Sequence, residues 1–386
     1  MGLLTALGPL AIDMYLPAFP AMAQSLDTNL GSIERTLASY LLGLACAQLI
    51  YGPIADRYGR KKPLLFGLAL FTVASVGCVL SNNIQHLSMW RVLQAFGGAA
   101  GMVIPRAVIR DKLDTQDAAK ALSMLMLIMG VTPILAPILG AQLLAYSSWH
   151  SIFIFMCGVG IVLFITAARA MKETLSTQHV IPLRPRLIAR NYYELSRHRR
   201  FIFYSLAAAF GSAGMFAYIA GSARVFISLF EVEPAHFGML FGLNAASLIV
   251  ASQFSARLLN RHTPDKLLRW AQNIQLLFIF SALVLTLSHS LTLLSLMVCL
   301  MGFMACQGFI SPNSAALALA DQGHRLGVAS ALMGTVQMLC GALAGFAVSS
   351  WQSSTPLPLT AVLAACAALS WLASRTAGVT RGIKLD

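Results

Sequence analysis

The chain has 386 residues, of which 58% are hydrophobic and only 11% are charged, and its net charge is +13. Soluble domains carry about 25% charged residues, so this composition excludes a soluble globular protein and indicates an integral membrane protein. A positive net charge can indicate nucleic-acid binding, but in a membrane protein Lys and Arg mark the cytoplasmic loops. No nucleic-acid partner is therefore expected.

Apolar segments long enough to cross a bilayer follow one another along the whole chain. A helix needs about 20 apolar residues to span the hydrocarbon core, whereas a barrel strand needs about 10 with alternating polarity. We therefore predict an all-α membrane protein with twelve transmembrane helices, at about residues 2–22, 35–55, 63–82, 86–108, 119–146, 149–170, 200–226, 236–258, 266–287, 291–317, 326–350 and 356–374. The first segment lacks a basic leader, so we expect no cleavable signal peptide, although a short cytoplasmic segment can precede it.

A long polar stretch rich in arginine separates six apolar segments from six more. This pattern predicts an N-terminal six-helix half over residues 1–171, a cytoplasmic linker over 172–199, and a C-terminal half with a short cytoplasmic tail over 200–386. Lys and Arg gather in alternate loops, in the linker and in the tail, so both termini should be cytoplasmic. Two six-helix halves are a known plan for secondary transporters.

Other classes of protein have little support in this sequence. All seven cysteines lie within apolar segments, so we expect neither a disulfide framework nor a metal site. The sequence holds no Walker A phosphate loop and no nucleophile motif of an enzyme. An ATP-driven pump, a membrane-embedded enzyme or a receptor is therefore disfavoured, and no cofactor is expected.

The first segment carries an acid, Asp13, about midway along its length. A charge there costs roughly 2.5–3.5 kcal/mol on insertion scales, so a retained ionisable residue indicates a function. Because burial disfavours the charged form of a carboxyl group, Asp13 can bind and release a proton. The alternative is a static ion pair that only joins helices. Pro17 and Pro20 remove backbone donors from the same segment and should loosen it.

The loop between the second and third segments reads Gly52-Pro-Ile-Ala-Asp56-Arg57-Tyr-Gly59-Arg60-Lys61-Lys62. Gly59 suits the tight reversal between two helices. Asp56 is the single acid of this basic loop, and it can sit at the positive N-terminus of another helix. The alternative is a solvated turn that only fixes topology.

The fourth segment carries Arg91 near its outer end, with Gln94 one helical turn further on. Arginine stays charged even when buried, so Arg91 can hydrogen-bond Asp13 or act on it through its field. The alternative is that the side chain extends to the outer interface. Gln94 can face the same cavity as Arg91.

Further candidates for a substrate site are uncharged residues within the segments, and they are Tyr40, Met215, Phe216, Tyr218 and Gln307. Methionine and aromatic side chains suit an adaptable apolar pocket. They are equally compatible with ordinary core packing, and a membrane glutamine can simply join helices. Arg224, near the outer end of the seventh segment, has no role that the sequence assigns.

The loop pattern Gly-x-x-x-Asp-Arg-x-Gly-Arg-Lys-Lys resembles the signature loop of the major facilitator superfamily. Three further stretches resemble its drug:proton antiporter branch: Leu7-Gly-Pro-Leu-Ala-Ile-Asp13-Met-Tyr-Leu-Pro17-Ala-Phe-Pro20, Arg91-Val-Leu-Gln94-Ala-Phe-Gly97-Gly98-Ala-Ala-Gly101, and Ala136-Pro137-Ile-Leu-Gly140-Ala141. The Asp-Met-Tyr-Leu-Pro element and the Arg110-Asp111 pair are similar to bicyclomycin-resistance (Bcr/CflA) type exporters. The helix-packing motif around Pro137 and Gly140 is weaker than usual, because Ala136 and Ala141 replace two glycines.

The resemblance implies a major facilitator fold and proton-driven export of small hydrophobic or amphipathic compounds across a bacterial inner membrane. It implies Asp13 as the proton-coupling acid and Arg91 as its partner. It also implies that Gly52, Asp56, Arg57, Gly59 and Arg60 form a conformational latch. The implied partners are a small-molecule substrate, protons and the lipid bilayer, and the protein should be a monomer. The alternative is an exporter of a natural metabolite, such as an amino acid or a sugar, on the same fold.

Overall fold

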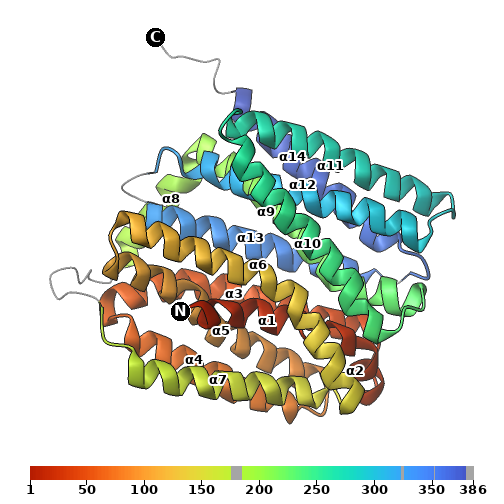
Figure 1. The fold of residues 1–386 in the computed structure, drawn as a ribbon, viewed down its shortest axis with the longest axis horizontal. Helices are drawn as coiled ribbons and strands as arrows, with labels where there is room; N and C mark the ends of the chain where they lie inside the picture. The colour runs from red at the N-terminus through yellow and green to blue at the C-terminus, as the bar shows by residue number, and fades with distance from the viewer. Residues whose placement is uncertain (175–184, 323–325, 352, 380–386) are drawn as a thin grey trace. The chain divides into compact units, whose positions relative to one another are not determined.

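The computed structural model describes residues 1–174, 185–322, 326–351 and 353–379, and every regular element within them is a helix (Figure 1). In this part of the chain, twelve helical spans are long and apolar enough to cross a membrane. Each of the twelve predicted segments falls on one of these spans. The prediction of an all-α protein with twelve transmembrane helices is therefore confirmed.

The helices form two compact units. Unit 1 comprises Met1–Arg184 and Val232–Gly242, and unit 2 comprises Pro185–Glu231 and Leu243–Asp386. Residues 175–184 of the predicted linker lie outside the described residues, and helix α8 (Pro185–Arg197) occupies most of its second part. The division into two six-helix halves joined at 172–199 stays a prediction.

Unit 1 consists mainly of long helices that follow one another along the chain. They are α1 (Gly2–Asp13), the 3-10 turn η1 (Leu16–Ala18), α2 (Phe19–Ser25), α3 (Leu30–Tyr58), α4 (Lys61–Val79), α5 (Ile84–Lys112), α6 (Thr115–Tyr146) and α7 (His150–Ala170). Helix α5 packs against α3 and α4, α4 packs against α7, and α1 contacts both α5 and α6 (Figure 1). This arrangement brings the helix that ends at Asp13 against the helix that carries Arg91.

The first span is broken rather than continuous. Helix α1 ends at Asp13, and the chain passes through η1 before α2 begins at Phe19. Pro17 and Pro20 lie in the first turns of η1 and α2, where the missing N–H of proline costs no hydrogen bond. The proline-containing sequence therefore produces a helix break directly after the membrane acid.

Local sequence signals set the helix ends in unit 1. Asn29, Asn83 and Asp114 precede α3, α5 and α6, and each side chain accepts a hydrogen bond from the amide three residues further on. Such N-caps satisfy amides that have no partner within the helix. At the other end of α3, Gly59 has φ 88°, a left-handed conformation that glycine adopts without strain. This turn allows α4 to begin two residues later.

Unit 2 contains the remaining helices and one irregular segment. They are α8, α9 (Arg199–Ala223), the π-helical turn η3 (Arg224–Leu229), α10 (Pro234–Leu258), α11 (Pro264–Leu287), α12 (Leu293–Leu319), α13 (Leu326–Ser350) and α14 (Leu357–Val379). The start of α10, as far as Gly242, belongs to unit 1, where Gly238 packs against Ile138 of α6. Helix α9 packs against α12, α13 and α14, and α11 packs against α12 and α14. Leu195 anchors α8 in a hydrophobic cluster with Phe201 and Tyr204 of α9.

The surfaces of the helices are apolar, as expected for a protein in lipid. Phe66 and Leu80 in unit 1, and Leu277 and Leu294 in unit 2, are 66–75% exposed. Soluble proteins rarely expose large continuous apolar surfaces. These side chains therefore fit contact with the hydrocarbon core of a bilayer.

Candidate functional site

The candidate site in unit 1 begins with Asp13 at the helix break. Its side chain is buried, with 2% of its surface exposed. Among the residues that the structure describes, Oδ1 of this carboxyl has no hydrogen-bond partner. A buried polar atom without a partner is unusual because it loses its hydration without compensation. Asp13 is therefore placed to hold a proton or to gain a partner in another state of the protein.

Arg91 of α5 is fully buried beside the end of α1. Its Nη2 donates to the carbonyl oxygen of Ala11 at 2.8 Å, and its Nη1 donates to Oε1 of Gln94 at 2.5 Å. The guanidinium carbon lies 4.2 Å from the ring centre of Tyr15 and 4.3 Å from that of Tyr40. A cation held between two aromatic faces and two oxygen acceptors is firmly oriented.

Two of the interpretations of Arg91 can now be compared with this geometry. Extension of the side chain to the outer interface is wrong, because the side chain is completely enclosed by protein. A direct contact with the acid is not observed either, since no ion pair joins Arg91 to Asp13 in the described part of the chain. Arg91 instead donates a hydrogen bond to the carbonyl oxygen of Ala11, two residues before Asp13. It therefore contacts the last turn of α1 and not the acid itself.

Gln94 lies in the same group as Arg91, as its position one helical turn further on predicted, and Tyr40 of α3 lies in this group as well. Gln94 accepts from Arg91 and donates from Nε2 to Ser75 Oγ at 2.8 Å. Its amide is thus occupied by protein groups, and this favours a positioning role. Tyr40 carries the Arg91 cation on its ring, and its hydroxyl lies 3.5 Å from the carbonyl oxygen of Gly8 in α1. Substrate binding by these two residues stays a prediction.

Glycines allow α1 to approach its neighbours at backbone distance. A Cβ atom added at Gly140 of α6 would collide with the carbonyl oxygen of Met14, the residue after Asp13. A Cβ atom added at Gly101 of α5 would collide with the carbonyl oxygen of Leu4. The packing motif predicted at Pro137 and Gly140 therefore contacts the helix break itself.

The loop between α3 and α4 forms an ion-pair cluster around Arg60. Its Nε donates to Asp111 Oδ2 at 2.8 Å and its Nη1 to Asp56 Oδ1 at 2.5 Å. Burial lowers the pKa of the Arg60 guanidinium, but the hydrogen bonds and charges of Asp111 and Asp56 outweigh burial and raise that pKa above its usual value. Arg57 points away and is exposed, so Asp56 and Arg60 carry the pairing.

Glu173 completes this cluster from the end of α7. Its carboxylate accepts from the backbone amides of Arg60 at 2.8 Å and Lys61 at 3.1 Å, at the start of α4. A Cβ atom added at Gly59 would collide with this carboxylate. Gly59 is therefore required both for its left-handed backbone and for the close approach of Glu173. No atom lies within 4 Å of the Cβ position at Gly52.

The remaining predicted residues belong to unit 2. Met215, Phe216 and Tyr218 lie on α9, and Phe216 packs against Gly341 of α13. Gln307 of α12 is buried beside Gly211 of α9, and its Oε1 has no hydrogen-bond partner among the described residues. The described structure does not join these residues to the group around Asp13.

Several charged residues of the spans were missed by the sequence interpretation. Glu34 on α3 is fully buried. Arg106 lies within the span of α5 and contacts Met129 Sδ at 3.6 Å. Arg106 could have been found as a charge within an apolar segment, whereas Glu34 lies directly before the predicted segment 35–55 and within the observed span. Asp111 was quoted only as part of the Arg110-Asp111 pair, and Glu173 gave no signal beyond its place directly after a span.

Arg224, which opens η3, donates to the carbonyl oxygen of Trp351 at 3.4 Å.

Twelve apolar spans indicate a multi-pass membrane protein, and a buried acid beside a break in the first span is a feature typical of transporters. A family model described as Major Facilitator Superfamily matches residues 1–345, and the chain belongs to this family. Its members are transporters and not enzymes.

Relatives of similar length support the same assignment. A Bacillus subtilis protein named as an uncharacterized MFS-type transporter, YdgK, is 35% identical over 97% of this chain and 93% of its own length. A bicyclomycin resistance protein homolog of Haemophilus influenzae is 31% identical over 97% of this chain and 94% of its own. The multidrug resistance protein MdtL of Klebsiella pneumoniae is 31% identical over 88% of this chain and 84% of its own. The resemblance found in the sequence motifs is therefore confirmed.

Solved structures confirm the fold. The xylose transporter XylE from E. coli, in a partially occluded inward-open conformation, matches with a TM-score of 0.72 at 12% identity, over 96% of this chain and 95% of that chain. A bacterial homolog of the human lysosomal transporter Spinster, in an inward-facing and occupied conformation, matches with a TM-score of 0.73 at 14% identity, over 99% of this chain and 95% of that chain.

Proposed function

We propose that the protein is a proton-coupled multidrug exporter of a bacterial inner membrane, which carries small hydrophobic or amphipathic compounds outward by alternating access. The observation that carries the proposal is the buried Asp13 carboxyl, whose Oδ1 has no partner among the described residues. An intramembrane acid of this kind is typical of proton relays in transporters. Two relatives named for bicyclomycin and multidrug resistance support the drug substrate class.

The proposed coupling step is a change of partner by Arg91. With Asp13 protonated and neutral, Arg91 donates to Ala11 and Gln94, as in the described structure. When Asp13 loses its proton, the new negative charge attracts the guanidinium from the neutral carbonyl oxygen of Ala11. Because Ala11 and Asp13 belong to α1 and Arg91 to α5, this exchange shifts one helix against the other.

Substrate contacts are proposed for Tyr40, Gln94, Met215, Phe216, Tyr218 and Gln307. These residues are aromatic, thioether or neutral amide groups, which suit hydrophobic and amphipathic compounds better than strongly polar ones. Protonation of Asp13 and binding of the drug are then proposed to favour different states of the protein.

The conformational latch is proposed to consist of Gly52, Asp56, Arg57, Gly59 and Arg60, with Asp111 and Glu173 added from the structure. Asp56 of α3 and Asp111 of α5 both accept from Arg60, and Glu173, after α7, accepts from the first amides of α4. These contacts join α3, α4, α5 and α7. Pro137 and Gly140 are proposed to hold α6 against the break of α1.

The proposed topology places both termini and the 172–199 linker in the cytoplasm, between the halves 1–171 and 200–386. The protein is proposed to act as a monomer in the bilayer, without a cofactor and without a nucleic-acid partner. A cysteine at the exposed Arg190 tests the orientation. An impermeant thiol reagent added to intact cells should not label the cysteine of Arg190→Cys. Labelling of this cysteine would show that the topology is the inverse of the proposed one.

Proton release on drug addition tests the coupling. Ethidium is added to the detergent-solubilised protein in weak buffer, and a pH-sensitive dye follows free protons. We expect release from the wild type and from Asp117→Asn, an exposed aspartate paired with Lys120, but none from Asp13→Asn. Release from Asp13→Asn at the wild-type level would contradict the assignment. Release with amino acids or sugars but not with drugs would retain the coupling and change the substrate class.

A further inference from the structure

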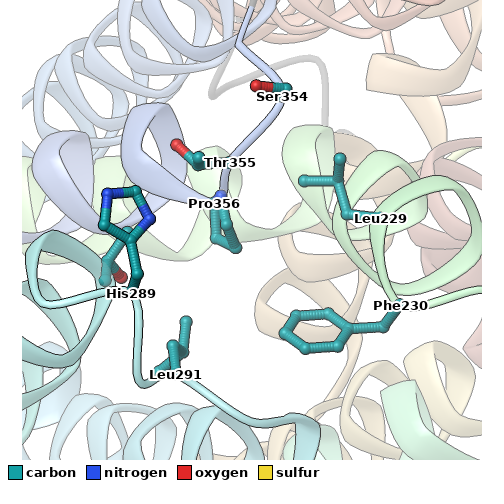
Figure 2. A pocket seen from close by; sticks show the side chains of 8 residues that line it. Leu229, Phe230, His289, Leu291, Ser354, Thr355 and Pro356 are labelled. Atoms are coloured by element: carbon teal, nitrogen blue, oxygen red, sulfur yellow. The ribbon is translucent and has the colours of Figure 1, made fainter.

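A cavity of about 190 Å³ opens at one end of unit 2, where η3, the end of α11 and residues 354–356 come together. Figure 2 shows the side chains of Leu229 and Phe230 on one side of the open space, and those of His289 and Pro356 on the other. All of the residues that line it belong to unit 2, whereas Asp13 and Arg91 belong to unit 1. The cavity therefore shares no residue with the proposed coupling site.

The walls of this cavity are chemically divided. Phe230, Leu229, Leu291 and Pro356 supply an apolar wall, and His289 with Ser354 and Thr355 supplies polar groups. Among the described residues, no hydrogen bond engages the His289 ring. Binding pockets typically combine an apolar lining with a few polar groups that orient a ligand.

The backbone around the cavity departs from regular geometry. The π-helical turn η3 ends at Leu229, on its edge, and such turns occur frequently at functional sites. In the described chain, three residues other than glycine have a positive φ, and two of them adjoin the cavity: Glu231 at 53° and His289 at 54°. Conformations of this kind persist where the surrounding structure imposes them, and they cluster at ligand sites.

We propose that this cavity is a binding site for a small amphipathic molecule, with one ring or a short hydrocarbon chain and a single uncharged hydrogen-bonding head group. An apolar cavity of about 150 Å³ accommodates benzene, so the volume suits one six-membered ring. The ring packs against Phe230 and Leu291, and the head group bonds His289 or Ser354.

The cavity lies at the end of unit 2 that is distant from α8, because α9 starts beside α8 and continues directly into η3. Under the proposed topology, which places α8 in the cytoplasm, this is the outer end of the unit. A molecule leaving the transporter, or one arriving from outside, then reaches the site without crossing the membrane. This location rests on the proposed function, whereas binding itself does not.

Binding of 4-fluorobenzyl alcohol to the whole protein in detergent, followed by ¹⁹F NMR, tests the proposal. We expect saturable binding to the wild type. Leu291→Trp fills the cavity and should weaken binding by about tenfold, the factor that corresponds to 1.4 kcal/mol. The matched control is Leu294→Trp, because Leu294 is 75% exposed and does not line the cavity.

A second pair of variants separates this site from the coupling site. Asp13→Asn should bind the probe as the wild type does, and His289→Asn, which tolerates the left-handed backbone, should bind it more weakly. Non-saturable signals that are the same in all proteins would mean partitioning into detergent and would overturn the proposal. Equal weakening by Leu291→Trp and Leu294→Trp, or loss of binding in Asp13→Asn, would also overturn it. Failure of the proton-release experiment alone would leave this site intact.

Discussion

The two units bury different chemistry. In the described chain, all four buried charged residues belong to unit 1, and they are Asp13, Glu34, Arg60 and Arg91. The buried polar residues of unit 2 are amides and hydroxyls, such as Gln272, Gln307 and Asn313. Charged groups within a membrane are costly and are retained where they have a function, whereas neutral amides mainly join helices. The comparison therefore supports the proposal that proton coupling lies in unit 1, whereas the buried amides of unit 2 join helices or contact the substrate.

One buried amide of unit 2, that of Gln272, lies in a closed network, although Oε1 of Gln307 and Oδ1 of Asn313 have no partner among the described residues. Gln272 of α11 donates to the carbonyl and hydroxyl oxygens of Ser370 in α14, and Ser374 donates to its Oε1 at 2.6 Å. In unit 1, the corresponding interior group leaves an oxygen of Asp13 without a partner in the described chain. A closed network holds one arrangement, whereas an open one can change when a proton arrives.

Replacement of one buried polar side chain in each unit should give the largest difference in efflux between the two units. Arg91→Met deprives Ala11 and Gln94 of their donor and removes a charge from beside Asp13, and each buried acceptor left without a partner costs about 1–3 kcal/mol. Gln272→Met breaks a neutral network, which costs about 1–3 kcal/mol. We expect Arg91→Met to abolish ethidium efflux from pump-deficient cells and Gln272→Met to reduce it only in proportion to protein level.

Thermal unfolding in detergent supplies the control for this pair, because efflux is compared at equal amounts of folded protein. Arg91→Lys should not restore efflux, since one ammonium group cannot replace a planar guanidinium held between two rings and two acceptors. Equal losses of efflux in the two variants would remove the functional distinction between the units.

Close glycine contacts in each unit allow a second comparison of the two units, with smaller expected effects on efflux and stability. Gly140→Ala in unit 1 places a methyl group against the carbonyl oxygen of Met14, and Gly308→Ala in unit 2 places one against that of Leu248. Overpacking costs about 1–3 kcal/mol, so both variants should unfold at lower temperature than the wild type. Only Gly140→Ala should lose efflux at a permissive temperature, because Met14 adjoins Asp13.

The control for both glycine variants is Gly158→Ala in α7, which meets no atom within 4 Å and replaces glycine in a helix by a better helix former. It should leave efflux and thermal unfolding close to those of the wild type. If Gly140→Ala retains efflux while Gly308→Ala loses it, the helix break is not part of the coupling device.

The sequence predicts the features of this molecule that depend on nearby residues. The twelve spans follow from apolar length, and the contact between Arg91 and Gln94 follows from their spacing on one helix face. The break after Asp13 was not predicted, because Pro17 and Pro20 indicated only a loosened helix. The break also lies against Gly140, which approaches the carbonyl oxygen of Met14 and lies far along the chain.

Contacts between distant segments were the main source of missed residues. Glu173 and Arg60 are 113 positions apart, so no local pattern joins them. The absence of a direct bond between Asp13 and Arg91 depends on how α1 is rotated against α5, where Leu4 closely approaches Gly101. Composition and motif spacing carry no information about such rotations.

The loop between α3 and α4 in unit 1 and the loop between α10 and α11 in unit 2 give the next prediction. Arg60→Gln should slow efflux markedly, since it removes the group that Asp56 and Asp111 share, and Asp111→Asn combined with it should add little further loss. Because the pKa of Arg60 is raised above its usual value, the guanidinium stays protonated at every pH used for transport. Its stabilisation is present below that pKa and lost only above it, so the defect should not vary between about pH 6 and pH 8. A defect that alkaline pH reproduces in the wild type would point to another group.

The smallest effect is expected at Asp265, directly after the loop between α10 and α11 of unit 2. Asp265, in the first turn of α11, accepts from Tyr204 Oη at 3.2 Å and pairs with Arg269 Nε at 3.1 Å. These groups are partly exposed, and exposed ion pairs contribute about 0–1 kcal/mol, so Asp265→Asn should shift thermal unfolding slightly and leave efflux near the wild-type rate. Arg60→Gln and Asp265→Asn are measured side by side in the same efflux assay. If Asp265→Asn proves as damaging as Arg60→Gln, the second loop also carries a latch, and the two units are functionally more alike than their buried charges indicate.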